Sequence, residues 1–299
     1  MSAPAPISYY LELQMLDEVS RKIFFNELAA HGAKHLVLTS PFMAMTFKNP
    51  ELAETVQKEL NSVGMSFGDV HLPYNQHFDL NTPFEEARKA VIARHKTAMR
   101  TAAMLNCKTM TIHVGTDHLY KDISFEQHFS RACSMLEELL IEAERLGVIL
   151  CIENGWTQTT STSTLLALQK KFDTTALGFC FDIGHANIMD NGRLYDSGEA
   201  YTRWNAIGVE VPPWEKAADK LRSLLPHVVN CHLHDNCGNK DQHQLPGKGN
   251  VNWQEITALL KQAPRLQAIQ SEVHVIRNGV TVKELVNCFE NLFDKDSEK

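Results

Sequence analysis

Residues 178–186 have the sequence GFCFDIGHA, an apolar run that ends in Asp182 and is followed three residues later by His185. A short apolar run that closes on a polar residue is typical of a buried strand with a functional side chain at its C-terminal tip. The same pattern recurs at intervals of 29–50 residues, close to the length of one strand plus one helix. The polar tips are His71 in GDVHLPY, His113 in MTIHVG, Glu153 in ILCIENG, Asp182 in GFCFDIGHA, His232 in VVNCHLHDN and Glu272 in AIQSEVH.

Strand and helix signals alternate along the whole chain. Strands are predicted over residues 7–14, 35–39, 66–71, 108–113, 148–153, 177–182, 228–232 and 266–272. Helices are predicted over about 17–31, after Asn49-Pro50, over 82–104 from a Thr82/Glu85 capping box, after Ser124/Gln127, over 162–171, after Asn252/Glu255 and from Thr281/Glu284 to 293. This alternation predicts an α/β protein with a single (β/α)₈ TIM barrel. We predict one domain over residues 1–299, with flexible ends at 1–6 and 294–299.

The composition limits the classes of function. The net charge of −7 and the absence of a basic stripe argue against nucleic acid as a partner. No apolar run approaches the length of about 18 residues that a membrane-spanning helix needs. Seven cysteines without a CxxC spacing favour free thiols in a reducing compartment, and no signal peptide is visible, so we predict a cytoplasmic protein. Homo-oligomerisation stays open.

Three carboxylates among imidazoles at buried strand tips would repel one another unless a cation neutralised them. We therefore expect Glu153, Asp182, His232 and Glu272 to bind one divalent metal ion. This mixture of oxygen and nitrogen ligands suits Mn²⁺, Zn²⁺, Co²⁺ or Mg²⁺. A second set of residues could supply ligands for more than one ion, contact the substrate, or hold the ligands by hydrogen bonds; its members are His71, His113, His185, Asp241 and His243.

Three connections between the predicted elements are longer than usual. Residues 40–48, SPFMAMTFK, are apolar and are predicted to form a loop that covers a pocket. Residues 186–214 carry Tyr195 and Trp204, and residues 235–251 are rich in Asn, Gly and Lys. All three should lie on the face of the barrel that carries the polar tips. Apolar and aromatic surroundings indicate a small enclosed substrate.

The motifs HLPY, IHVG, IENG, FDIGHA, HLHDN, DQHQLPGKG and SEVH resemble those of the xylose isomerase-like TIM-barrel superfamily. This superfamily contains sugar and sugar-phosphate isomerases and epimerases, and also endonuclease IV. The resemblance to the epimerases implies that Glu153, Asp182, His232 and Glu272 are metal ligands, that the two glutamates exchange protons with the substrate, and that His185 touches it. The resemblance to endonuclease IV implies three zinc ions and nine ligands, and residues of matching type occur at His71, His113, Glu153, Asp182, His185, His232, Asp241, His243 and Glu272.

The choice of His232 over the neighbouring inward residue His234 rests on that family pattern. The sequence also departs from the pattern, because the epimerases have an arginine shortly after the strand-seven histidine and this chain has none there. Lys248 or Lys240 could meet a phosphate or carboxylate of the substrate instead. We predict a divalent-metal-dependent isomerase or epimerase that acts on a small sugar or sugar phosphate by proton transfer next to the carbonyl. The alternatives are an endonuclease IV-like phosphodiesterase with several zinc ions, a dehydratase or lyase on the same scaffold, and a non-catalytic metal-binding protein.

Overall fold

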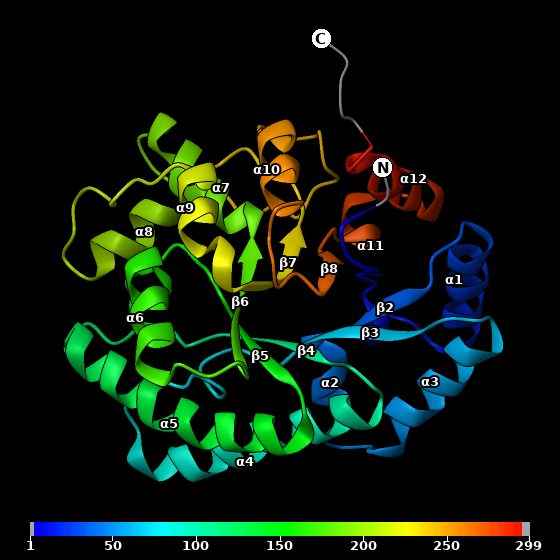
Figure 1. Cartoon of the computed structure of the whole chain (residues 1–299), viewed down its shortest axis with the longest axis horizontal. Helices are drawn as coiled ribbons and strands as arrows, with labels where there is room; N and C mark the ends of the chain where they lie inside the picture. The colour runs from blue at the N-terminus through cyan, green and yellow to red at the C-terminus, as the bar shows by residue number, and fades with distance from the viewer. Residues whose placement is uncertain (1–2, 295–299) are drawn as a thin grey trace.

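The computed structural model describes residues 3–294, in which eight parallel strands close into one barrel in chain order, with β8 paired to β1 (Figure 1). This confirms the predicted (β/α)₈ TIM barrel. The strands are β1 Ile7–Tyr9, β2 His35–Leu38, β3 Ser66–His71, β4 Thr109–Ile112, β5 Ile149–Glu153, β6 Leu177–Asp182, β7 Val228–Leu233 and β8 Ala268–Ser271.

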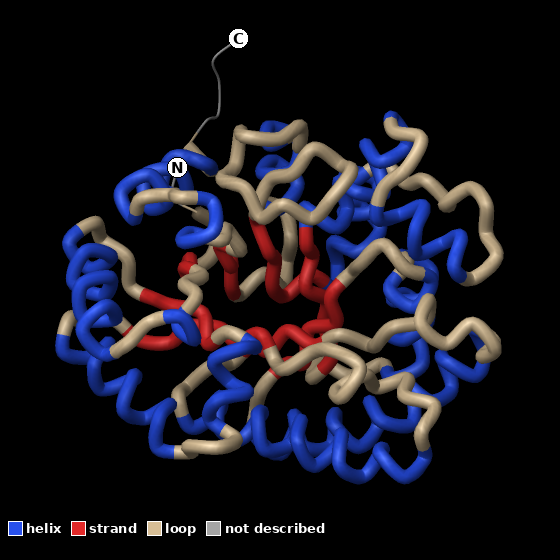
Figure 2. The backbone as a smooth tube through the Cα atoms, turned by 180° about the vertical axis from the view of Figure 1, so that it is seen from behind, coloured by secondary structure: helices blue, strands red, loops and turns tan. Residues whose placement is uncertain are grey.

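Helices surround the barrel, and the strands lie inside them when the molecule is seen from behind (Figure 2). Leu36, Ile112 and Phe179 are among the fully buried residues of the core that these layers form. None of the helices in residues 3–294 combines the length and apolar character needed to cross a membrane. The helices are α1 Glu18–Ala30, α2 Ser40–Thr46, α3 Glu51–Ser62, α4 Glu85–Met104, α5 Phe125–Leu146, α6 Thr162–Phe172, α7 Ile183–Asn191, α8 Glu199–Ala206, α9 Ala217–Leu224, α10 Trp253–Leu260, α11 Val275–Asn278 and α12 Val282–Leu292.

Two of the predicted helix starts form reciprocal capping boxes, Ser124 with Gln127 on α5 and Thr281 with Glu284 on α12. Each box satisfies backbone N–H groups that have no partner inside the helix. The box predicted at Thr82 is wrong. The Thr82 hydroxyl accepts from the nearby Phe84 N–H, and α4 begins later, at Glu85. The proline after Thr82 therefore belongs to the approach to the helix.

The first strand is shorter than predicted, because the chain leaves the sheet after Tyr9 and forms a 3₁₀ turn over Leu13–Met15. Residues just before this strand are packed against the barrel. Ala5 is buried, and the Pro6 carbonyl accepts a hydrogen bond of 3.0 Å from the Ile269 N–H. Of the ends predicted to be flexible, residues 1–2 and 295–299 lie outside the described residues.

The prediction that residues 40–48 form a pocket-covering loop is wrong, because most of this segment forms helix α2. Pro41 lies in the first turn of this helix, where backbone N–H groups have no partner within the helix, so the N–H that proline lacks is not needed. Phe42 and Met43 point into the main core and are fully buried. No residue of this segment lines the cavity described below. Its apolar character reflects packing on the barrel wall.

Candidate metal centre

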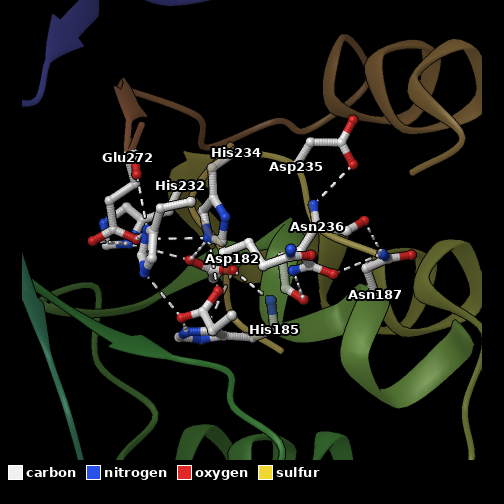
Figure 3. A network of polar contacts seen from close by, with 12 residues as sticks. Asp182, His185, Asn187, His232, His234, Asp235, Asn236 and Glu272 are labelled. Atoms are coloured by element: carbon white, nitrogen blue, oxygen red, sulfur yellow. Dashed lines mark hydrogen bonds and ion pairs between the residues drawn. The ribbon is translucent and has the colours of Figure 1, made fainter. Parts of the chain in front are cut away.

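Four of the predicted tips converge at the C-terminal end of the barrel, and Figure 3 shows three of them, Asp182, His232 and Glu272. Glu153 and Asp182 end β5 and β6, His232 lies on β7, and Glu272 directly follows β8. Each offers one ligand atom, and these atoms all lie within 4.8 Å of one another. All four residues are buried, so three carboxylates share a region from which water is largely excluded. Such a group needs positive charge to remain ionised.

His232 presents Nδ1 to the carboxylates. This atom lies 3.0 Å from Glu153 Oε1, 3.5 Å from Glu272 Oε1 and 3.7 Å from Asp182 Oδ2. The other ring nitrogen, Nε2, lies 3.1 Å from the hydroxyl of Thr111 on β4. Hydrogen bonds to the far nitrogen orient metal-binding histidines. Thr111, which the sequence patterns did not reveal, therefore contributes to the orientation of the His232 ring.

The charges in this group compensate one another strongly. Burial favours the neutral imidazole of His232, but Cys180 and the carboxylates of Glu272 and Glu153 raise its pKa well above the usual value. Burial would raise the pKa of Glu153, yet the imidazoles of His232 and His113 lower it well below the usual value. Protons on imidazole thus supply the positive charge that a divalent ion would otherwise bring. The donor set of three carboxylates and one imidazole fits such an ion.

Two further predicted histidines lie on the outer oxygen of Glu153. His113 Nε2 is 2.6 Å from Glu153 Oε2, and His71 Nε2 is 3.3 Å from the same atom. One carboxylate therefore faces His232 with Oε1 and faces these two imidazoles with Oε2. Tyr74 stacks on His113 with ring centroids 4.7 Å apart, and burial, with Glu272 and Glu153, raises the pKa of Tyr74 to about 12. His71, His113 and Glu153 form a second group that could hold an ion.

Three histidines share one hydrogen-bond pattern that sets their tautomer. In each of them Nδ1 lies 2.8–2.9 Å from a backbone carbonyl oxygen and must donate to it, because a carbonyl can only accept. Nε2 is then left without a proton in the neutral ring and is directed at a carboxylate, which is how protein imidazoles are prepared for metal binding. The pairs are His71 with Leu72, His185 with Asn154, and His243 with Glu272.

The loop after β7 brings Asp241 and His243 to the barrel mouth. His243 Nε2 lies 3.0 Å from Asp241 Oδ2, and His185 Nε2 lies 3.4 Å from the same oxygen. Burial would raise the pKa of Asp241, but the imidazoles of His243 and His234 lower it well below the usual value. His243 has a φ of 49°, a left-handed conformation that is uncommon outside glycine.

A network of amides and one carboxylate holds this loop in place (Figure 3). Asp235 accepts hydrogen bonds from the N–H groups of Asn236 and Gly247 and from the indole of Trp253. Asn236 donates to the Gly184 carbonyl, and Asn187 donates to Asn236 Oδ1 and to a second asparagine, Asn250. The network ties residues 235–250 to α7, whose N-cap is Asp182.

His234 is fully buried and lies between the two groups of carboxylates. Its Nε2 is 3.2 Å from Asp182 Oδ2, 3.7 Å from Asp241 Oδ1 and 3.8 Å from Glu272 Oε2. Both histidines of the HLH motif therefore face the centre, as alternation in a strand requires. His234, Asp241 and His243 form a further group that could hold an ion.

A cavity of about 500 Å³ opens over these residues. His71, His113, Glu153, His185, Asp241, His243 and Glu272 line it. Lys248 is exposed and does not line it, so the structure does not bring this predicted substrate-binding residue to the centre. Trp156 and Arg203, which the sequence analysis did not single out, form part of the wall instead. The predicted aromatic residue Trp204 packs in a separate core cluster with Trp156 and Ile188.

Comparisons with known proteins agree with the fold. An uncharacterized protein of Methanocaldococcus jannaschii is 28% identical over 238 residues, which make up 77% of this chain and 72% of that protein. The structure is similar to that of a D-tagatose 3-epimerase-like protein, with a TM-score of 0.72 and 21% identity over 96% of this chain and 98% of the other. It is also similar to a D-psicose 3-epimerase solved in the presence of D-fructose, with a TM-score of 0.68 and 14% identity over 98% and 97% of the two chains.

At these identities the structural likenesses show the fold alone. The family is shown by the sequence, because a family model described as a xylose isomerase-like TIM barrel matches residues 25–273. That range is more than half of the chain and contains all six polar strand tips, from His71 to Glu272. The chain belongs to the xylose isomerase-like TIM barrel family.

Proposed function

We propose that this protein is a divalent-metal-dependent isomerase or epimerase that moves a proton at the carbon next to the carbonyl of a small sugar. The observation that carries this proposal is the convergence of the fully buried Asp182 and His232 with Glu153 and Glu272, which line the 500 Å³ cavity. A volume of this order suits a small polar molecule. The similarity to a D-psicose 3-epimerase and to a D-tagatose 3-epimerase-like protein supports the sugar class.

A bound divalent ion would polarise the substrate carbonyl and make the neighbouring C–H more acidic. Glu153 and Glu272 then act as the proton-transfer pair. They come from β5 and after β8, which are not neighbours in the barrel, and therefore approach the centre from different sides. One carboxylate removes the proton and the other returns one, which produces the epimer. His113, 2.6 Å from Glu153 Oε2, can hold a proton that Glu153 has taken.

The proposal is tested by incubating the protein with ketoses and ketose phosphates in deuterated water. Metal-dependent deuterium uptake at the carbon next to the carbonyl, abolished by chelator and restored by Mn²⁺ or Co²⁺, is expected. Loss of water from the sugar in the same experiment would identify a dehydratase. No exchange with any sugar, in protein shown to contain metal, would refute the proposal.

A metal-dependent phosphodiesterase is the second candidate function. The observation in its favour is that all nine residues predicted from the likeness to endonuclease IV lie around one cavity or directly beneath it. Against it, Arg203 is the only Lys or Arg among the described residues that line the cavity. Nucleic-acid affinity comes largely from several phosphate contacts made by such cations. Salt-sensitive cleavage of an abasic duplex, without sugar exchange, would favour this candidate over the first.

Metal stoichiometry tests whether Asp241 and His243 bind an ion of their own, separate from the ion proposed at Glu153, Asp182, His232 and Glu272. Replacing Asp241 and His243 together by alanine should lower the metal content by one ion while the ion at Glu153, Asp182, His232 and Glu272 remains. Elemental analysis of protein purified without chelator measures this, and Lys240→Ala, an exposed neighbour in the same loop, is the matched control. Equal metal content in the double variant and the control would show that Asp241 and His243 bind no ion.

Metal uptake at Asp241 and His243 should depend steeply on pH. Burial lowers the pKa of His243, but Asp241 outweighs it and the pKa rises to about 9. At pH 7 the metal-free ring is therefore protonated, and an ion must displace that proton. Affinity for Mn²⁺ should rise about tenfold per pH unit from pH 7 and level off above about 9. Calorimetry in buffers of different ionisation enthalpy measures the released proton, and a pH-independent affinity would contradict the assignment.

A further inference from the structure

Arg203 lies in the cavity wall, stacked on an aromatic ring. It comes from α8, and its guanidinium carbon is 4.7 Å from the centre of the Trp156 ring. The same indole packs edge-on against His185, with ring centroids 4.4 Å apart. One indole ring therefore separates the guanidinium from the candidate metal centre. A stacked guanidinium is held flat, and its N–H groups remain available at the edge.

The guanidinium makes no direct ion pair. Among residues 3–294 no carboxylate oxygen lies within 4.0 Å of its nitrogen atoms, although Glu199 stands one helical turn earlier on α8. Its closest polar neighbour is the ring of His118, 3.5 Å from Nη1, which also lines the cavity. Burial lowers the pKa of Arg203, and the carboxylates of Glu199, Asp117 and Asp241 oppose that shift. Because none of them makes a direct ion pair with it, the guanidinium keeps N–H groups that can bind an anion.

One arginine and four carboxylates, those of Asp79, Glu153, Asp241 and Glu272, line the cavity. Glu153 and Glu272 belong to the candidate metal centre, so an anionic group there would be repelled unless a cation held it. Arg203 lies across the Trp156 ring from His185 and contacts His118. A substrate whose carbonyl lies at the metal centre and whose anionic group reaches Arg203 would meet complementary charge at both places.

We propose that Arg203 recognises the anionic group of the substrate, a phosphate monoester or a carboxylate, so that the proposed enzyme acts on anionic ketoses in preference to neutral ones. This inference rests on the proposed function for the identity of the sugar. The sequence has no arginine shortly after β7, and in this proposal Arg203 on α8 supplies the cation to the cavity instead. An arginine fork suits bidentate binding of either anion.

The test is calorimetric binding to metal-loaded protein of ketohexoses, their 6-phosphates and the corresponding ketohexuronates. Wild-type protein should bind one anionic series about 10–100-fold more tightly than the neutral sugars, as hydrogen bonds to a charged group imply. Arg203→Gln should remove that difference and leave the neutral sugars unchanged. Arg203→Lys should keep part of it. The preferred series decides between phosphate and carboxylate.

Arg193→Gln is the matched control, because Arg193 precedes α8, pairs with Asp190 at 3.2 Å and lies outside this cavity. Melting temperature and metal content of each variant show that the fold and the centre are intact. Equal affinity of wild-type protein for neutral and anionic sugars, or an equal loss for both in Arg203→Gln, overturns the inference. Binding is measured without turnover, so anion recognition without deuterium exchange would refute the proposed function and leave only the recognition of an anion by Arg203 standing.

Discussion

Replacing either Glu153 or Glu272 by glutamine is expected to reduce deuterium exchange by about 10²–10⁴-fold, the range that a positioned acid or base contributes. Glutamine keeps the size of the side chain but can neither accept the proton nor carry the negative charge. Both carboxylates are buried, and their pKa values are lowered from the usual range by neighbouring imidazoles against the effect of burial. Each is therefore ionised at neutral pH and ready to accept a proton.

The matched control for this pair is Glu138→Gln on α5, where the carboxylate is exposed and pairs with Lys96 at 3.4 Å. Exchange should be unchanged in that variant. The two site variants should also fail with every sugar that the wild-type protein accepts, because each loses a proton-transfer carboxylate that is also a proposed ligand of the ion. Full exchange in either Glu153→Gln or Glu272→Gln, with metal still bound, would exclude that residue from the proton-transfer pair.

Gly184→Ala should destabilise the protein, although alanine normally favours a helix. Gly184 lies in the first turn of α7, and a Cβ there would overlap the imidazole of His234. The ring cannot move freely, because its Nε2 lies 3.2 Å from Asp182 and the ring stacks on His243 at 4.2 Å. Overpacking of this kind costs about 1–3 kcal/mol. Thermal and denaturant unfolding measure the loss, and metal content should fall as His234 pushes on Asp182.

Making Gly184→Ala in a second variant protein separates the overlap with His234 from other effects of the substitution. In His234→Ala protein the overlap is absent, so Gly184→Ala should then stabilise by up to about 1 kcal/mol, the usual helix preference of alanine over glycine. The sign of the effect thus reverses between the two backgrounds. The same sign in both would show that the close approach of Gly184 and His234 does not limit stability.

Much of the centre could be predicted from strand patterns. An apolar run that ends in a polar residue is enough to predict the position of Glu153, Asp182 or His232. The reason is that the C-terminal ends of parallel strands meet on one face of the barrel. Alternation along a strand also puts His232 and His234 on the same side. The barrel itself followed from eight such runs separated by helix signals.

The positions of site residues outside the strands depend on tertiary contacts, which local sequence patterns do not reveal. Arg203 lies on a helix within the long connection after β6, and its place in the wall depends on stacking against Trp156 in the loop after β5. Lys248 was close in sequence to Asp241, yet the turn at residues 245–248 leaves it exposed. The segment 40–48 was apolar because it packs on the core, and Pro41 was the helix-start signal that indicated this.

The central claim is that Glu153, Asp182, His232 and Glu272 together hold a divalent ion. Elemental analysis of wild-type protein purified without chelator, beside Glu272→Gln and the control Glu138→Gln, tests it most directly. We expect at least one Mn, Zn, Co or Mg per chain in the wild-type protein and the control, and one ion fewer in Glu272→Gln. Equal metal content in all three, or no metal in protein that exchanges deuterium at the full rate, would contradict it.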